Sequence, residues 1–97
     1  MFEVKWTLEA ETLYYETLEY WVNRNQSNTY VLKIINEVER KEKLLSENPF
    51  IGAVIIGAKD KVRRVLVLEN FSLHYRIQKN TIEIVSFWAN KKDSSNL

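Results

Sequence analysis

The side chains of this sequence that could carry out chemistry are mostly basic and follow residue 60. They are an arginine pair, a histidine, a third arginine and a lysine pair: Arg63, Arg64, His74, Arg76, Lys91 and Lys92. Histidine is the residue that most often transfers protons near neutral pH, and guanidinium and ammonium groups bind phosphate oxygens. These residues would suit an anionic or polar target, and His74 is either a candidate general base or a solvated side chain of a strand.

The spacing of these residues limits the chemistry they can do. In the alternating stretch FSLHYRIQ, the side chains of Ser72, His74 and Arg76 fall on one face of a strand. No acid is placed to orient the imidazole, so the pattern does not predict a serine-nucleophile triad. The neighbours Arg63 and Arg64 must point to opposite faces. We expect one of them to contact phosphate and the other to pair with helix acids or a protein partner.

The stretch SFWANKKD (86–93) passes abruptly from an apolar strand to polar residues. Phe87 and Trp88 lie on opposite faces of the strand end, so at most one of them can close a core. We predict that the other forms a contact site with the polar residues that follow. The predicted target-binding residues are Arg63, Arg64, Trp88, Asn90, Lys91 and Lys92.

Composition excludes several classes of protein. The 97 residues include no cysteine and one histidine, which rules out a disulfide framework and a zinc site built from Cys and His. We expect no metal and no cofactor. The net charge is +1, with nine acids and six bases in residues 1–48 and four acids and eight bases in residues 49–97. The second half would attract a polyanion or an acidic partner, although dedicated nucleic-acid binders are usually more basic.

No segment reads as a secretory signal or a membrane span. The N-terminus lacks a basic start followed by an apolar core, and the most apolar stretch, FIGAVIIGA (50–58), is nine residues long. We expect a cytoplasmic protein without membrane contact.

The first half of the sequence predicts a strand and two helices. FEVKW (2–6) alternates apolar and charged residues, as in a strand with one buried face. Thr7 can cap a helix over 8–24, and a polar break then leads to a second helix that ends before Pro49. So short a connection predicts an antiparallel helical hairpin.

The second half predicts three strands in a meander, at 62–68, 71–78 and 81–88, separated by the pairs Glu69-Asn70 and Lys79-Asn80. The expected architecture is α+β, in the order βααβββ, with one sheet covered on one face by the helical hairpin. We expect a single domain over 1–97, in which 90–97 forms a frayed tail.

Several of these residues, in this order and spacing, resemble the RelE/ParE superfamily of bacterial toxins from type II toxin–antitoxin pairs. They are Ala10 in the first helix, Leu45, Asn48, Pro49 and Gly52 after the second, Val62, Arg63 and Arg64 on one strand, Tyr75, Arg76 and Ile77 on the next, and Phe87, Trp88, Asn90, Lys91 and Asp93 at the end. The resemblance covers almost the whole chain.

The resemblance implies a growth-inhibiting toxin that a cognate antitoxin neutralises, and its target stays open. A ParE-like toxin would bind DNA gyrase, whereas a RelE-like toxin would cleave mRNA on the ribosome; an inactive relic that only binds antitoxin is a third alternative. A nuclease would use His74, Arg76 and Arg64 as catalytic residues. The sequence departs from the nuclease pattern because no Tyr, His or Arg follows Trp88. The expected assemblies are a homodimer or a toxin–antitoxin hetero-oligomer.

Two further groups of residues allow two interpretations each. The segment 50–58 either extends the sheet, with 53–57 pairing back through a turn at Lys59-Asp60, or forms an apolar patch that docks the antitoxin or a second copy. We favour the sheet extension. The helix aromatics are expected mostly in the core, with a partner-binding stripe as the alternative; they are Tyr14, Tyr15, Tyr20, Trp21 and Tyr30.

Overall fold

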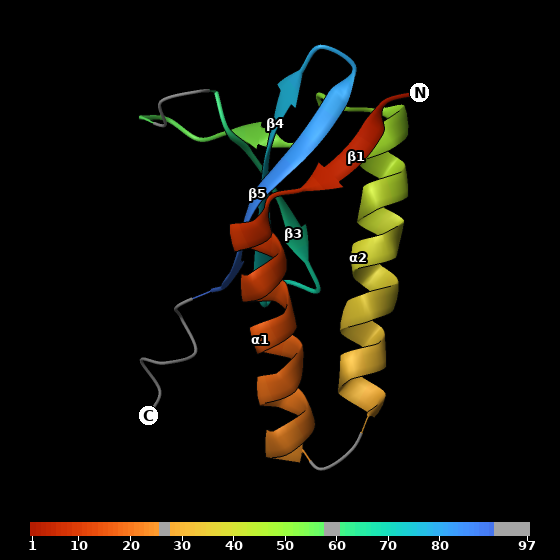
Figure 1. The fold of residues 1–97 in the computed structure, drawn as a ribbon, viewed down its shortest axis with the longest axis vertical. Helices are drawn as coiled ribbons and strands as arrows, with labels where there is room; N and C mark the ends of the chain where they lie inside the picture. Colours follow the sequence, from red (N-terminus) through yellow and green to blue (C-terminus); the bar gives the residue numbers. More distant parts are fainter. Residues whose placement is uncertain (26–27, 58–60, 91–97) are drawn as a thin grey trace.

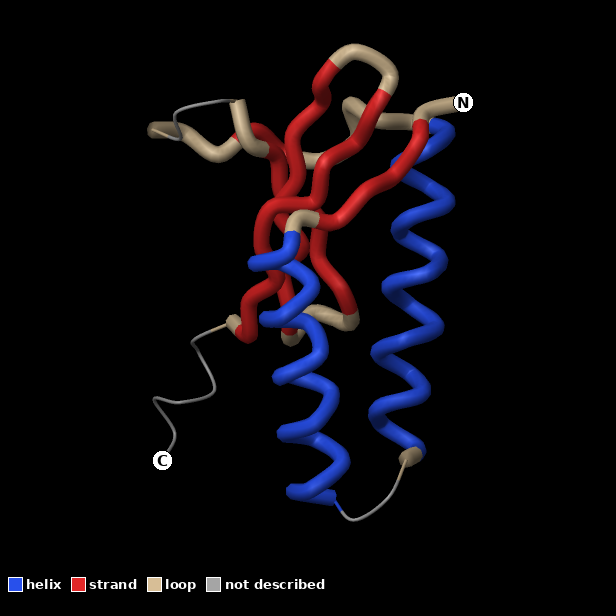
Figure 2. Tube along the Cα trace, viewed as in Figure 1, coloured by secondary structure: helices blue, strands red, loops and turns tan. Residues whose placement is uncertain are grey.

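The helical hairpin lies against one face of a single sheet, as Figures 1 and 2 show for the computed structural model, which describes residues 1–25, 28–57 and 61–90. The elements are β1 (Glu3–Trp6), α1 (Leu8–Asn25), α2 (Thr29–Glu47), β2 (Ala53–Val54), β3 (Arg63–Val67), β4 (Phe71–Gln78) and β5 (Thr81–Ala89). The predicted α+β class and the order of strand, two helices and antiparallel strands are confirmed. Within the described residues, neither helix has an apolar stretch long enough to cross a lipid bilayer.

Helix α1 begins at the predicted cap. The hydroxyl of Thr7 accepts a hydrogen bond of 3.1 Å from the backbone N–H of Ala10, and the Thr7 carbonyl accepts one of 3.0 Å from Glu11. The side-chain bond satisfies one of the backbone donors that a helix start leaves unpaired. Glu9 and Glu11 lie in the first turn, where carboxylates suit the positive end of the helix dipole.

Helix α2 packs one face against the sheet and ends just before Pro49. Its buried residues recur three, four and seven positions apart, as a helix with one apolar face demands; they are Val31, Ile34, Val38 and Leu45. Asn48 donates its backbone N–H to the Leu44 carbonyl at 2.8 Å and leaves the helical conformation at the residue before Pro49.

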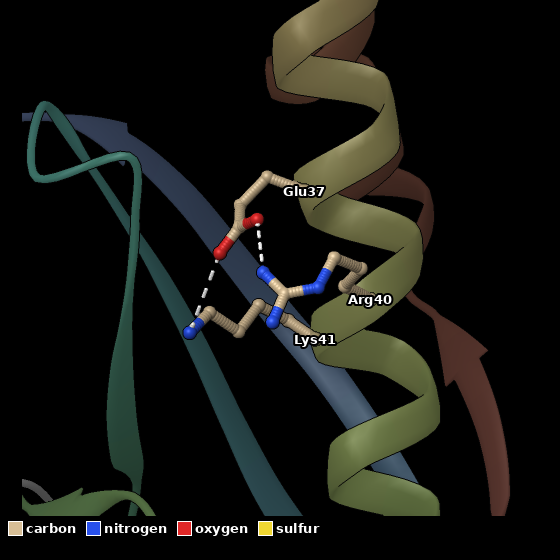
Figure 3. A network of polar contacts seen from close by, with 3 residues as sticks. All are labelled: Glu37, Arg40 and Lys41. Atoms are coloured by element: carbon tan, nitrogen blue, oxygen red, sulfur yellow. Dashed lines mark hydrogen bonds and ion pairs between the residues drawn. The ribbon is translucent and has the colours of Figure 1, made fainter.

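The charges in the middle of α2 pair along the helix. Glu37 accepts a 2.6 Å hydrogen bond from Arg40 one turn later, and its other carboxylate oxygen lies 3.5 Å from the Lys41 ammonium (Figure 3). Pairs with this spacing contribute roughly 0.2–0.5 kcal/mol each. The two pairs neutralise the Glu37 carboxylate but, because both lie within α2, they do not connect α2 to other elements.

The sheet has the strand order β1-β5-β4-β3-β2, so the first and last strands of the chain are neighbours. β1 pairs with β5 in parallel, and every other pairing is antiparallel. Between β4 and β5 the register shifts: His74 lies opposite Ser86, whereas Tyr75 lies opposite Ile84. Val85 is thus an extra residue, a β-bulge. It places Phe87 on the helix side, where it is buried, and Trp88 on the other side, where it is exposed.

Aromatic rings link the helices to the sheet through the core. Tyr14 of α1 lies 5.1 Å from Phe87, Phe87 stacks at 5.6 Å on Phe71, and Tyr30 of α2 lies 4.9 Å from Trp21. Tyr14, Trp21 and Tyr30 are half-buried against this core, as expected for most of the helix aromatics. The other two, Tyr15 and Tyr20, remain exposed.

The apolar segment after α2 extends the sheet, as we favoured, and docking of a partner on it stays a prediction. Ala53 and Val54 pair with β3, and the Ile55 N–H donates to the Val62 carbonyl at 2.8 Å, so the segment does extend the sheet. The predicted turn at Lys59-Asp60 lies outside the described residues. The extension is short, and most of its apolar side chains still face solvent; those exposed are Phe50, Ile51, Val54 and Ile56.

Candidate target-binding face

A basic and aromatic row crosses the face of the sheet that the helices leave uncovered. Arg64 of β3 lies directly opposite His74 of β4. Trp88 of β5 stacks on the His74 ring, with the ring centroids 5.7 Å apart and the planes 28° from parallel. Arg64 is exposed, and Trp88 keeps 53% of its surface accessible. This Arg64–His74–Trp88 row presents a cation and an aromatic side chain to solvent.

The imidazole in the middle of the row is kept neutral. Burial lowers the pKa of His74 below the ordinary histidine value, and the neighbouring Arg64 guanidinium lowers that pKa further. Among the described residues, no carboxylate forms a hydrogen bond or ion pair with the ring. A neutral imidazole can accept a proton, but here it lacks the acidic partner that usually orients a catalytic histidine.

We predict that the protein loses stability as the pH falls below about 6.5, the ordinary pKa of histidine. In that range the unfolded chain binds a proton that the folded chain, with its lower His74 pKa, does not. The free energy of unfolding must therefore decrease as the pH falls. His74 is the one histidine of the chain, so an NMR titration reads its folded pKa directly. Urea unfolding of His74→Asn should show a flatter pH dependence between pH 7 and 5.5; an unchanged slope would contradict the assignment.

Ser72 and Asn90 hold the end of β5 in place. The Ser72 hydroxyl is buried and donates to the Asn90 side-chain oxygen at 2.7 Å, so it does not face the imidazole as a nucleophile would. The Asn90 amide donates to the Glu69 carbonyl at 2.8 Å, and its backbone N–H donates to Asn70 at 2.8 Å. The side chain of Asn90 thus has a structural role, and target binding by it stays a prediction.

Arg76 shares the uncovered face with His74 but is engaged by a carboxylate. Its Nε donates to Glu83 at 2.6 Å across β4 and β5, and each side chain is 28% exposed. A carboxylate this close opposes the attraction of an RNA phosphate to the same guanidinium. Sequence reasoning missed Glu83, although a two-residue turn at Lys79-Asn80 places it opposite Arg76.

Arg63 serves the loop between α2 and β2. It donates to the Phe50 carbonyl at 3.1 Å and to the Gly52 carbonyl at 2.8 Å, and its guanidinium lies 5.1 Å from the centre of the Phe50 ring. The sequence could not tell which of the two arginines faces the uncovered side; the structure assigns Arg64 to it. A target-binding role for Arg63 therefore stays a prediction.

The structure thus brings together all three residues predicted as catalytic, Arg64, His74 and Arg76, on one face with Trp88. The predicted contact residues Lys91 and Lys92 lie outside the described residues. Within the described part of the chain, no group of three or more acidic or histidine side chains is arranged to hold a metal ion.

Comparison with known proteins finds similarity to a solved structure. No family model matches the sequence, and no curated protein matches it. Among solved structures, a chain from the chromosomal ParDE TA (toxin–antitoxin) system of P. aeruginosa superposes with a TM-score of 0.75. The two sequences are 21% identical, and the match covers 94% of this chain and 98% of that chain. The chain therefore has the fold of a component of a ParDE toxin–antitoxin system, consistent with the RelE/ParE resemblance of its sequence.

Proposed function

We propose that this protein is the toxin of a type II toxin–antitoxin pair, which inhibits bacterial growth in the cytoplasm until a cognate antitoxin neutralises it. The observation that carries the proposal is the end-to-end structural match to a chain of a ParDE system. The motifs that resemble the superfamily supply independent support, because they are distributed over the same elements.

We further propose that the protein acts by binding its target, with DNA gyrase as the ParE-like candidate. The Arg64–His74–Trp88 row would supply the contact surface, and Lys91 and Lys92, which follow Asn90 in the sequence, are further proposed contacts. The ion pair between Arg76 and Glu83 weighs against phosphate chemistry on this face. Residues 89–97 include no Tyr, His or Arg, which weighs against it as well, since RNA cleavage needs an acid for the leaving oxygen.

A second candidate is a ribosome-dependent mRNA endoribonuclease. One observation favours it: the lowered pKa of His74 leaves a neutral imidazole beside the Arg64 guanidinium. Such a pair could take the proton from a 2′-hydroxyl and stabilise charge on the phosphate. His74 would then be the general base, with Arg64 and Arg76 as the cationic groups.

Induction of the protein alone in a bacterial host tests the proposal. Growth, protein synthesis, mRNA integrity and the SOS response should be followed in parallel, with and without the protein encoded in the adjoining reading frame. We expect growth arrest with filamentation and gyrase-linked DNA breaks, relieved by the adjoining protein. Rapid mRNA cleavage that His74→Asn abolishes would instead establish the nuclease. Unimpaired growth would contradict a toxin and leave the antitoxin-binding relic.

A further inference from the structure

Helix α1 leaves several of its large apolar side chains uncovered. Of its 18 residues only Ala10 is fully buried, whereas α2 buries four. Leu8, Tyr15 and Val22 are exposed by 79%, 58% and 37% of their surfaces. A surface helix normally turns such residues towards the core. Helix α2, all of which the structure describes, has no comparable row of exposed apolar residues, and its single exposed large apolar side chain is Leu32.

Three of the four exposed apolar residues of α1, Leu8, Tyr15 and Val22, lie on one side of the helix, whereas Tyr20 lies on another side. The three recur seven positions apart, which is close to two helical turns, so they line up along the outer side of α1 with a drift of about 20° per repeat. Three residues at this spacing extend along roughly 21 Å of helix. These residues thus supply one apolar side chain per heptad along a length that a second helix can follow. We call Leu8, Tyr15 and Val22 the α1 stripe.

Carboxylates border the α1 stripe. On a helical projection Glu11 lies on one side of the stripe, Glu16 on the other, and Glu19 within it. All three are exposed. Within the described residues no cation pairs with them, in contrast to Glu37 of α2, which holds both Arg40 and Lys41. The base of α1 nearest to them in sequence is Arg24, in the last turn.

From this pattern we infer that the α1 stripe is a docking surface for a cationic amphipathic helix of a partner protein. The apolar stripe supplies the area to be buried, and the carboxylates pair with Lys or Arg at the flanking positions of the incoming helix. The same carboxylates disfavour the other occupants. A second copy would bring its own α1 acids against them, and nucleic acid or an anionic membrane would be repelled.

A pair of synthetic helical peptides tests the charge requirement. Both have 21 residues with leucine at the a and d heptad positions; one carries lysine at e and g, and the other carries glutamate there. We expect the lysine peptide to bind the full-length protein at least about tenfold more tightly than the glutamate peptide, and to weaken as salt is added. Fluorescence anisotropy of the labelled peptides measures both affinities. Equal affinities, or binding of neither peptide, would overturn the inference.

Substitutions in the protein test the location. Tyr15→Ser with Val22→Ser should weaken the lysine peptide at least about tenfold, since two buried apolar side chains are lost from the contact. The combination of Glu11→Gln, Glu16→Gln and Glu19→Gln should remove most of the salt dependence. Leu32→Ser is the matched control, because it removes a comparably exposed apolar residue from α2, and it should leave binding unchanged. Equal losses in the control and the α1 variants would place binding elsewhere.

The test measures the stability of each variant separately from its peptide binding. The substituted residues are exposed, so the thermal midpoint by circular dichroism should stay close to that of the parent protein. The inference also does not rest on the proposed toxin activity. A chain that fails to inhibit growth can still bind the lysine peptide, and a toxic chain can fail to bind it.

Discussion

Replacing Gly52 with alanine should lower the free energy of unfolding by about 2–3 kcal/mol, a large effect for the addition of one methyl group. A Cβ atom at this position would lie 2.7 Å from the Tyr75 hydroxyl oxygen and 2.9 Å from the Arg64 carbonyl oxygen. Tyr75 is fully buried and cannot move aside. Its hydroxyl accepts a hydrogen bond from the Gly52 N–H at 2.9 Å and donates to the Pro49 carbonyl at 2.7 Å. Accommodating the methyl group would strain or break both bonds. Urea unfolding measures the change.

Two companion substitutions separate the causes of this loss. Gly57 has an open surrounding but a φ of +89°, so Gly57→Ala should cost only about 1 kcal/mol, from backbone conformation. Tyr75→Phe removes the hydroxyl and leaves the Gly52 N–H and the Pro49 carbonyl without their partner, which should cost about 1–3 kcal/mol. If Gly52→Ala proves as mild as Gly57→Ala, the close packing against Tyr75 is not what makes glycine necessary there.

Arg64→Ala should abolish growth inhibition while leaving the protein folded, and Arg63→Ala should do nearly the reverse. Arg64 is exposed in the Arg64–His74–Trp88 row, so its loss should change stability by no more than about 0.5 kcal/mol. If it is a central contact, target affinity falls at least about tenfold. Arg63 instead donates to the Phe50 and Gly52 carbonyls. Its loss should cost about 1–2 kcal/mol of stability.

Each of the two arginine variants serves as the control for the other. Colony counts after induction of each variant report toxicity, and urea unfolding of the purified variants reports stability. Equal toxicity of Arg64→Ala and the parent protein would remove the uncovered face of the sheet from the proposed mechanism. Equal loss of toxicity in both variants, with only Arg63→Ala destabilised, would mean that the loop held by Arg63 also meets the target.

The helices and long strands could be predicted because their signals are local. The Thr7 cap, the break at Pro49 and the alternation of 71–78 depend on neighbouring residues alone, and the structure has these elements within a few residues of the predicted bounds. The placement of β1 next to β5 depends on residues far apart in the sequence. The sequence pattern does not predict it.

The face on which each candidate residue lies could not be predicted for the same reason. Strict alternation from Glu83, which lies opposite Arg76, would put Phe87 on the uncovered face and Trp88 in the core. The bulge at Val85 exchanges them. The position of a bulge depends on how two strands pack together. No residue type within 81–88 indicates that a bulge occurs there. The orientation of Arg63 and Arg64 likewise follows from the pairing of β3 with β4, which the sequence left open by one residue.

The adjacency of β1 and β5 has a consequence for how the protein is made. β1 has β5 as its neighbour in the sheet, and α1 also contacts β5. During synthesis, residues 1–25 therefore leave the ribosome long before β5 has been synthesised. Contacts between such distant segments form late and slowly. Until residues 81–89 have left the exit tunnel, the nascent chain cannot complete the sheet. The uncovered face needs the same strand, which supplies Trp88. A chain interrupted before this strand would thus lack the proposed target-binding surface, and the nascent protein acquires that surface in the same step in which β5 joins the sheet.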